Sequence, residues 1–115
     1  MTGVMLTDDL IFFSRVSATA RAHGHVVKQA RTVDELLRRI AEDQATAAIL
    51  DLHNETLDLP ALLATLGSTV RTIGYGSHVD AALLRAAREA GCGVVMPRSQ
   101  FVAKLETNLP QWLQS

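Results

Sequence analysis

The sequence has little cysteine, no long apolar run and no excess of charge of one sign, and each absence excludes a class of protein. Its one cysteine, Cys92, cannot form an intramolecular disulfide, which fits a reducing compartment. Eleven basic and twelve acidic residues give a formal net charge of −1, so the broad basic surface of a nucleic-acid-binding domain is missing. No apolar run approaches the ~20 residues that a membrane-spanning helix needs, and the N-terminus lacks the pattern of a secretory signal. We therefore expect a cytoplasmic protein that binds neither nucleic acid nor membranes.

The composition is typical of one globular domain. The chain has 115 residues, of which 48% are hydrophobic and 20% are charged. This length is enough for a core that needs no disulfide or metal. Because no repeat, linker or low-complexity segment interrupts the chain, we expect a single domain at 1–115.

Short apolar runs alternate with segments of helical period. The runs predict five strands, at Val4–Leu6, His25–Ala30, Ala47–Leu50, Val70–Tyr75 and Val94–Met96. Between the first two strands, apolar residues recur at helical spacing and are expected to face inward: Leu10, Phe13, Val16 and Ala20. Near the C-terminus, Ser99 is expected to cap the last helix and Pro110 to break or end it. Trp112 is then expected to lie back on the body of the domain.

Five alternations of strand and helix predict an α/β fold, with a doubly wound parallel sheet in the middle of three layers. The run Ala47–Leu50 is apolar at successive positions, which is typical of a parallel strand covered on both faces. Because crossovers are right-handed, few topologies remain, and the common five-stranded solution is flavodoxin-like with strand order 2-1-3-4-5. In such folds the ligand site lies at the carboxyl ends of the strands.

Polar residues follow four of the predicted strands and are expected to meet at this edge of the sheet. Asp8 and Asp9 follow the first strand, Asp51 the third, the segment 74–78 the fourth and Arg98 the fifth. Clustered carboxylates repel one another unless a cation shares the site, and carboxylate and carbonyl oxygens suit Mg²⁺. A carboxylate beside such an ion can also attack phosphorus and form an aspartyl phosphate. Taken alone, Asp51 would more often be a cap or turn residue, but its convergence with the acid pair favours a site.

The acid pair at 8–9, Asp51 and the segment REAGCGVVMPRS at 88–99 resemble the receiver domains of bacterial response regulators (CheY-like). The resemblance covers nearly the whole chain. It implies that Asp51 accepts phosphate from a histidine kinase. It also implies that Asp9, with Asp8, holds Mg²⁺ together with Asp51 and the backbone carbonyl of His53. The protein would then be a signalling protein that binds other proteins, not an enzyme.

Several positions depart from the receiver pattern and indicate an atypical receiver, or pseudo-receiver. Arg98 stands where the family has a lysine, and its planar fork does not replace a compact ammonium. Gly76 lacks the hydroxyl of the family's serine or threonine, although Ser77 next to it has one. The other altered positions are Ser99 in place of proline, Val95 in place of an aromatic residue and Glu55 in place of a loop proline.

Three functions therefore stay open. The first is a stand-alone receiver in two-component signalling or a phosphorelay, with Mg²⁺-dependent phosphorylation at Asp51. The second is a phosphorylation-independent interaction or scaffold module that uses the fourth helix, fifth strand and fifth helix, including self-association as a homodimer. The third is a small flavodoxin-like ligand-binding protein. Against this function, no phosphate-binding loop follows the first predicted strand.

Overall fold

Strands and helices alternate along residues 1–114, which are the residues that the computed structural model describes. The strands are β1 Thr2–Leu6, β2 Val26–Ala30, β3 Ala47–Asp51, β4 Arg71–Gly76 and β5 Val94–Pro97. The helices are α1 Leu10–Ala22, α2 Val33–Asp43, α3 Leu59–Leu66, α4 Ala81–Ala90, α5 Arg98–Ala103 and α6 Leu105–Leu113. Every predicted strand is present, and no bound differs from the prediction by more than two residues.

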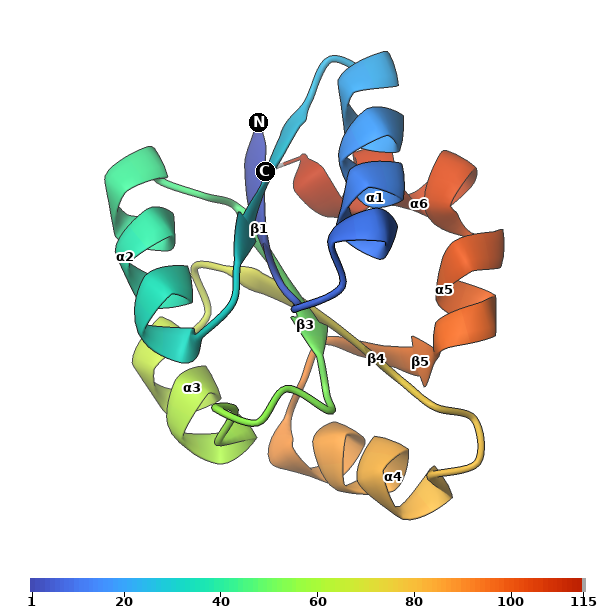
Figure 1. The fold of residues 1–115 in the computed structure, drawn as a ribbon. Helices are drawn as coiled ribbons and strands as arrows, with labels where there is room; N and C mark the ends of the chain where they lie inside the picture. The colour runs from blue at the N-terminus through green and yellow to red at the C-terminus, as the bar shows by residue number, and fades with distance from the viewer. Residues whose placement is uncertain (115) are drawn as a thin grey trace.

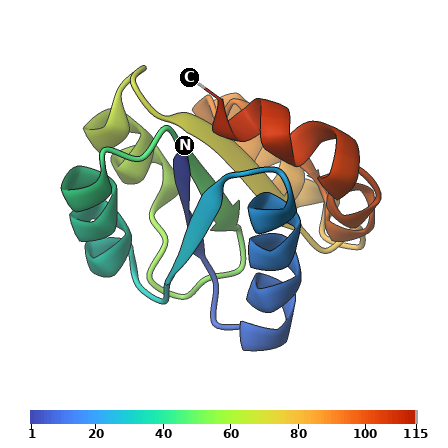
Figure 2. The same ribbon diagram turned by 90° about the horizontal axis from the view of Figure 1, so that it is seen from above.

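All strand pairs are parallel, and the strands lie in the order β2-β1-β3-β4-β5. Helices α1, α5 and α6 cover one face of the sheet, and α2, α3 and α4 cover the other (Figure 1). Figure 2 shows the sheet between these two helical layers. The predicted fold class, a three-layer doubly wound sheet with strand order 2-1-3-4-5, is confirmed. None of the helices in residues 1–114 is long and apolar enough to cross a membrane.

Successive residues of the central strands point into two different cores, because side chains alternate across a strand. Met5 and Ile49 pack with α1, α5 and α6 on one face. Leu6 and Leu50 pack with α2 and α3 on the other. This double burial explains why β3 is apolar at successive positions.

Helix α1 is rotated relative to the predicted apolar stripe. Val16 and Ala20 are buried as expected, but Leu10 is 55% exposed and Phe12 is buried instead. Phe13 is only partly buried against the same core. The rotation follows from the N-cap at Asp9, which fixes where the first turn begins and so directs Phe12 toward the sheet.

The C-terminal helical segment differs from the prediction in two ways. Ser99 is not a cap, because α5 begins at Arg98 with Pro97 before it and with no side-chain cap. Pro110 does not end the helix, because α6 continues through it to Leu113, and the break lies at Lys104 instead. A proline inside a helix removes one backbone hydrogen bond, and here the burial of the following turn offsets that loss.

The end of α6 is held by two side chains, one at the start of β4 and one just before β3. Arg71 donates to the carbonyls of Gln111 and Trp112, at 2.6 and 3.0 Å, and Thr46 donates to the carbonyl of Leu113 at 2.6 Å. These donors satisfy carbonyls that a helix end leaves without partners. Trp112 lies on the body of the domain as predicted and stacks on Phe101.

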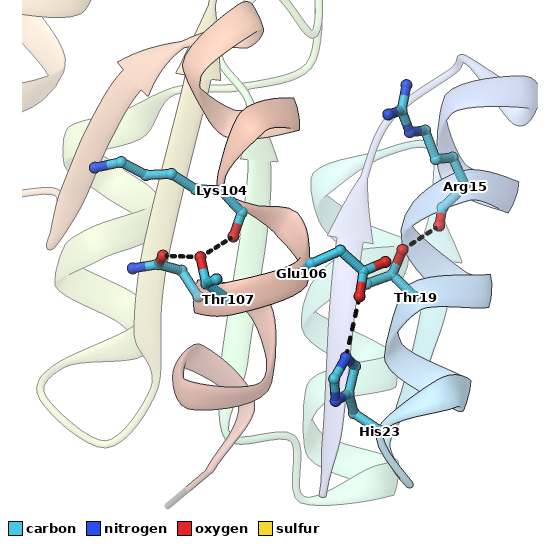
Figure 3. Close-up of polar contacts among 7 residues, drawn as sticks. Arg15, Thr19, His23, Lys104, Glu106 and Thr107 are labelled. Carbon is cyan, nitrogen blue, oxygen red and sulfur yellow. Dashed lines mark hydrogen bonds and ion pairs between the residues drawn. The ribbon is translucent and has the colours of Figure 1, made fainter.

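Helices α1 and α6 pack beside each other on the same face of the sheet. Figure 3 shows the polar contact at their exposed edge, where His23 Nε2 lies 3.3 Å from Glu106 Oε2. On α1, the hydroxyl of Thr19 donates to the carbonyl of Arg15 and stays within its own helix (Figure 3). The contact between the two helices therefore depends mainly on the apolar core beneath it.

Candidate functional site

The carboxyl ends of β3, β4 and β5 border a cavity of about 730 Å³. Its lining includes Asp51, His53, Tyr75, Ser77, Arg98 and Ser99. The volume lies within the ~300–1,000 Å³ that is common for ligand sites. We call this edge, with Asp9 beside it, the rim. The sequence-predicted residues Asp51 and Arg98 thus meet at one cavity, although 46 positions separate them in the chain.

Asp51 is the last residue of β3 and is half-buried. Its Oδ1 accepts the backbone N–H of His53 at 2.9 Å, which is a local turn of the kind that aspartate favours. Within residues 1–114, this bond occupies only one of the two carboxylate oxygens. Asp51 is therefore both a turn residue and an oriented carboxylate at the cavity.

Asp9 uses both of its carboxylate oxygens. Its Oδ1 accepts the backbone N–H of Phe12 at 2.9 Å and so caps α1. Its Oδ2 accepts a hydrogen bond from Arg98 Nη2 at 3.1 Å. The Phe12 N–H and then Arg98 hold the pKa of Asp9 below its ordinary value. Asp8, the other predicted acid, has an exposed side chain.

Arg98 is the first residue of α5, and an aromatic ring holds its guanidinium. The Cζ atom lies 4.0 Å from the centroid of the Phe12 ring, a cation–π distance. Phe12 contacts Tyr75 and Phe101 edge to face, with centroids 5.4 and 5.9 Å away. This aromatic cluster lies beneath the rim and brings α1 next to α5.

Tyr75 lies on β4 beneath the rim and is 2% exposed. Its hydroxyl is buried and has no hydrogen-bond partner within residues 1–114. Burial raises the pKa of Tyr75 far above its ordinary value, and the nearby charges of Asp51 and Asp9 also raise it. The phenol is therefore neutral near the two carboxylates.

The side chain of His53 joins two loops of the rim. Its Nε2 accepts the backbone N–H of Ser77 at 2.9 Å, so Nε2 carries no proton in this arrangement. A Cβ on Gly76 would lie 3.2 Å from the same nitrogen, closer than side chains normally approach. The imidazole thus lies against the position where receivers have a hydroxyl. Ser77 Oγ accepts the N–H of Val79 at 3.3 Å within its own loop.

Sequence reasoning missed two of these groups, Phe12 and Tyr75, and it did not predict the contact that the imidazole of His53 makes. The signal for Phe12 was its position three residues after the capping Asp9, which fixes the face of the helix. Tyr75 is the sequence's one tyrosine and lies one residue before the end of β4. No spacing in the sequence indicated that His53 would reach the loop after β4.

The structure brings Asp9, Asp51 and Arg98 to the rim, and the side chain of Asp8, next to Asp9 in the chain, is exposed. Across residues 1–114, no three His, Cys, Asp or Glu side chains converge in a metal-binding arrangement. Mg²⁺ binding by Asp8, Asp9, Asp51 and the His53 carbonyl stays a prediction. By their chemistry, the carboxylate oxygens of Asp9 and Asp51 and that carbonyl are donors that suit a hard cation.

No protein-family model matches the sequence, and no curated protein matches it. Solved structures match the fold. The signal receiver domain of a DNA-binding response regulator (merR) from Colwellia psychrerythraea 34H has a TM-score of 0.81 at 11% identity, covering 100% of this chain and 99% of that one. A response regulator from Burkholderia pseudomallei, solved with a phosphorylated aspartic acid, a calcium ion and citrate, has a TM-score of 0.73 at 21% identity, covering 96% of this chain and 69% of that one.

NtrX from Brucella abortus, solved with ADP, is longer than this chain. Its TM-score is 0.75 at 15% identity, and the match covers 96% of this chain but only 26% of NtrX. The chain thus spans about a quarter of that protein. At these low identities the matches establish the fold and not the activity. The chain has the fold of the receiver domains of response regulators.

Proposed function

We propose that the chain is a receiver-type signalling module that acts by binding another protein, with Asp51 as a phosphorylatable carboxylate. The observation that carries the proposal is the position of Asp51. The N–H of His53 orients its carboxylate at the end of β3, and the residue lines the rim cavity. In such a transfer, a carboxylate oxygen attacks phosphorus, the bond from phosphorus to the donor's imidazole breaks, and the imidazole leaves with the electron pair.

Asp9, Asp51 and the His53 carbonyl would hold Mg²⁺, as the calcium ion in the Burkholderia structure suggests by analogy. The ion would supply positive charge that offsets repulsion between the two carboxylates and an incoming phosphoryl group. Two residues of the chain itself also shape the cavity that would receive the phosphoryl group. Arg98 supplies a permanent positive charge at the cavity, and Tyr75 supplies a neutral hydroxyl beneath it.

Exposed apolar side chains near the rim support a protein partner. Ile11, at the start of α1, is 86% exposed, and Val79, in the loop after β4, is 79% exposed. Both follow strands whose carboxyl ends reach the rim. Contact between a partner and these residues would connect binding to the state of Asp51. The partner would be a signalling protein such as a histidine kinase.

A specific observation favours a second function, a module that binds its partner without phosphorylation. The His53–Ser77 bond and the Asp9–Arg98 pair join the loops of the rim through contacts within the chain itself. A rim held in one arrangement would present a constant surface. Self-association through α4, β5 and α5 belongs to this function.

Beryllofluoride, a mimic of a carboxyl phosphate, separates the two functions. We expect wild-type protein with Mg²⁺ and millimolar beryllofluoride to shift the amide NMR signals of Asp51, Ser77 and Arg98. The isosteric variant Asp51→Asn, which keeps the turn but not the charge, should not respond. No shift in wild-type protein would exclude phosphorylation and leave the second function.

A further inference from the structure

We propose that Arg98 is an internal competitor for the divalent cation, so that Asp9 pairs either with the guanidinium or with the metal. This rests on the proposed function only in placing Mg²⁺ at Asp9 and Asp51. The new element is that Arg98 lowers the affinity of the rim for Mg²⁺.

Each carboxylate oxygen of Asp9 already accepts a hydrogen bond. Oδ1 accepts from the N–H of Phe12 and Oδ2 from Arg98. The Phe12 bond also caps α1, so breaking it would disturb the helix. The oxygen that a metal can take at lower cost is Oδ2, which Arg98 occupies.

Electrostatic repulsion opposes the presence of both the metal ion and the Arg98 guanidinium at Oδ2. A divalent ion bound at Oδ2 would lie next to the guanidinium, and two cations at such a distance repel strongly. Arg98 cannot relieve the repulsion by losing its proton, because arginine stays charged in proteins. Metal binding therefore requires the guanidinium to move away from Asp9.

The Phe12 ring holds the Arg98 guanidinium beside Asp9. The guanidinium lies over the Phe12 ring, and Phe12 is 5% exposed and packed against Tyr75 and Phe101. The ring therefore adds to the ion pair in holding the cation beside the acid, and a metal at Oδ2 has to displace the guanidinium from both contacts. A lysine would compete less well, since its ammonium is more strongly hydrated and does not stack.

The strength of the competition follows from exposure. The side chains of Arg98 and Asp9 are 50% and 42% exposed, so solvent screens the ion pair. A screened pair together with a cation–π contact lowers metal affinity by roughly tenfold and does not abolish it. By linkage, bound metal weakens the Arg98–Asp9 pair by the same factor and frees the guanidinium beside the cavity that Asp51 lines.

Titration with MgCl₂ alone, followed by ¹H–¹⁵N NMR at constant ionic strength, tests the proposal. We expect Arg98→Met, which keeps the apolar stem, to bind Mg²⁺ about tenfold more tightly than wild type. Arg98→Lys should fall between the two. Arg85→Met on α4 makes the same charge change at an exposed position away from the rim, and it should match wild type. In wild-type protein the Arg98 side-chain Nε–H signal should shift as the metal binds.

Two results would overturn the proposal while leaving the proposed function in place. One is wild-type Mg²⁺ binding that Arg98→Met does not tighten beyond Arg85→Met. The other is an Arg98 Nε–H signal that keeps its position, and its contact with the Phe12 ring, in the metal-saturated protein. If neither wild type nor Arg98→Met binds Mg²⁺ at tens of millimolar, both this inference and the metal part of the proposed function are wrong.

Discussion

The carboxylate of Asp9 accepts hydrogen bonds from a backbone N–H at the start of a helix and from a guanidinium 89 positions later in the chain. Both donors favour the charged form of the acid, so both lower its pKa. The backbone bond is the larger cause, and the bond with Arg98 comes next. Asp9 therefore caps α1 and also holds Arg98 at the rim.

We expect the pKa of Asp9, measured by NMR titration of its carboxyl carbon, to lie below its ordinary value of 3.8. Because the folded-state pKa is lowered, the stabilisation from this group is complete above the ordinary pKa. It is lost as the pH falls through the lowered pKa. Arg98→Met should raise the pKa only part of the way back, since the Phe12 N–H remains. A folded-state pKa at or above 3.8 would contradict these assignments.

At the scale of elements, α6 shows that a proline is tolerated in a helix when the turn after it is well held. Three side chains of α6 are buried: Leu109, Trp112 and Leu113. Arg71 donates hydrogen bonds to the backbone carbonyls of Gln111 and Trp112. The fit is close, because a Cβ on Gly3 would lie 2.5 Å from Leu113 Cδ2. A glycine in β1 therefore makes room for the end of α6.

We expect Arg71→Met to lower the free energy of unfolding by about 1 kcal/mol, because two carbonyls at the end of α6 lose their charged donor. Urea unfolding followed by far-UV circular dichroism measures the change. Arg85→Met, which removes an exposed arginine from α4, is the matched control and should have little effect. Equal stabilities of the two variants would show that the contacts of Arg71 do not hold α6.

At the scale of the whole molecule, the sequence was sufficient for the topology and for the meeting of Asp9, Asp51 and Arg98. Apolar runs separated by helices, with right-handed crossovers, leave few sheet orders, and the common one among them places these strand ends together. The partners of individual side chains could not be predicted. Whether Arg98 pairs with Asp9 or with Asp51 depends on the rotation of α1 that brings Phe12 beneath the guanidinium.

The two cores share one sheet, and this sharing predicts how the domain unfolds. Met5 and Leu6 are neighbours on β1 but belong to different cores, so the loss of either core destabilises a strand on which the other core depends. We propose on this ground that the chain is a single cooperative domain. Trp112, its one tryptophan, reports on the core beneath α1, α5 and α6, whereas far-UV circular dichroism reports on all helices.

In a urea titration we expect Trp112 fluorescence and far-UV circular dichroism to give coincident transitions, as two-state unfolding requires. Arg71→Met is a stricter test of coincidence, because it weakens the attachment of α6, the helix that carries Trp112. Both signals should move together to lower urea in that variant. A fluorescence transition that precedes the loss of helix would mean that α6 detaches as a separate unit, and the single-domain proposal would be wrong.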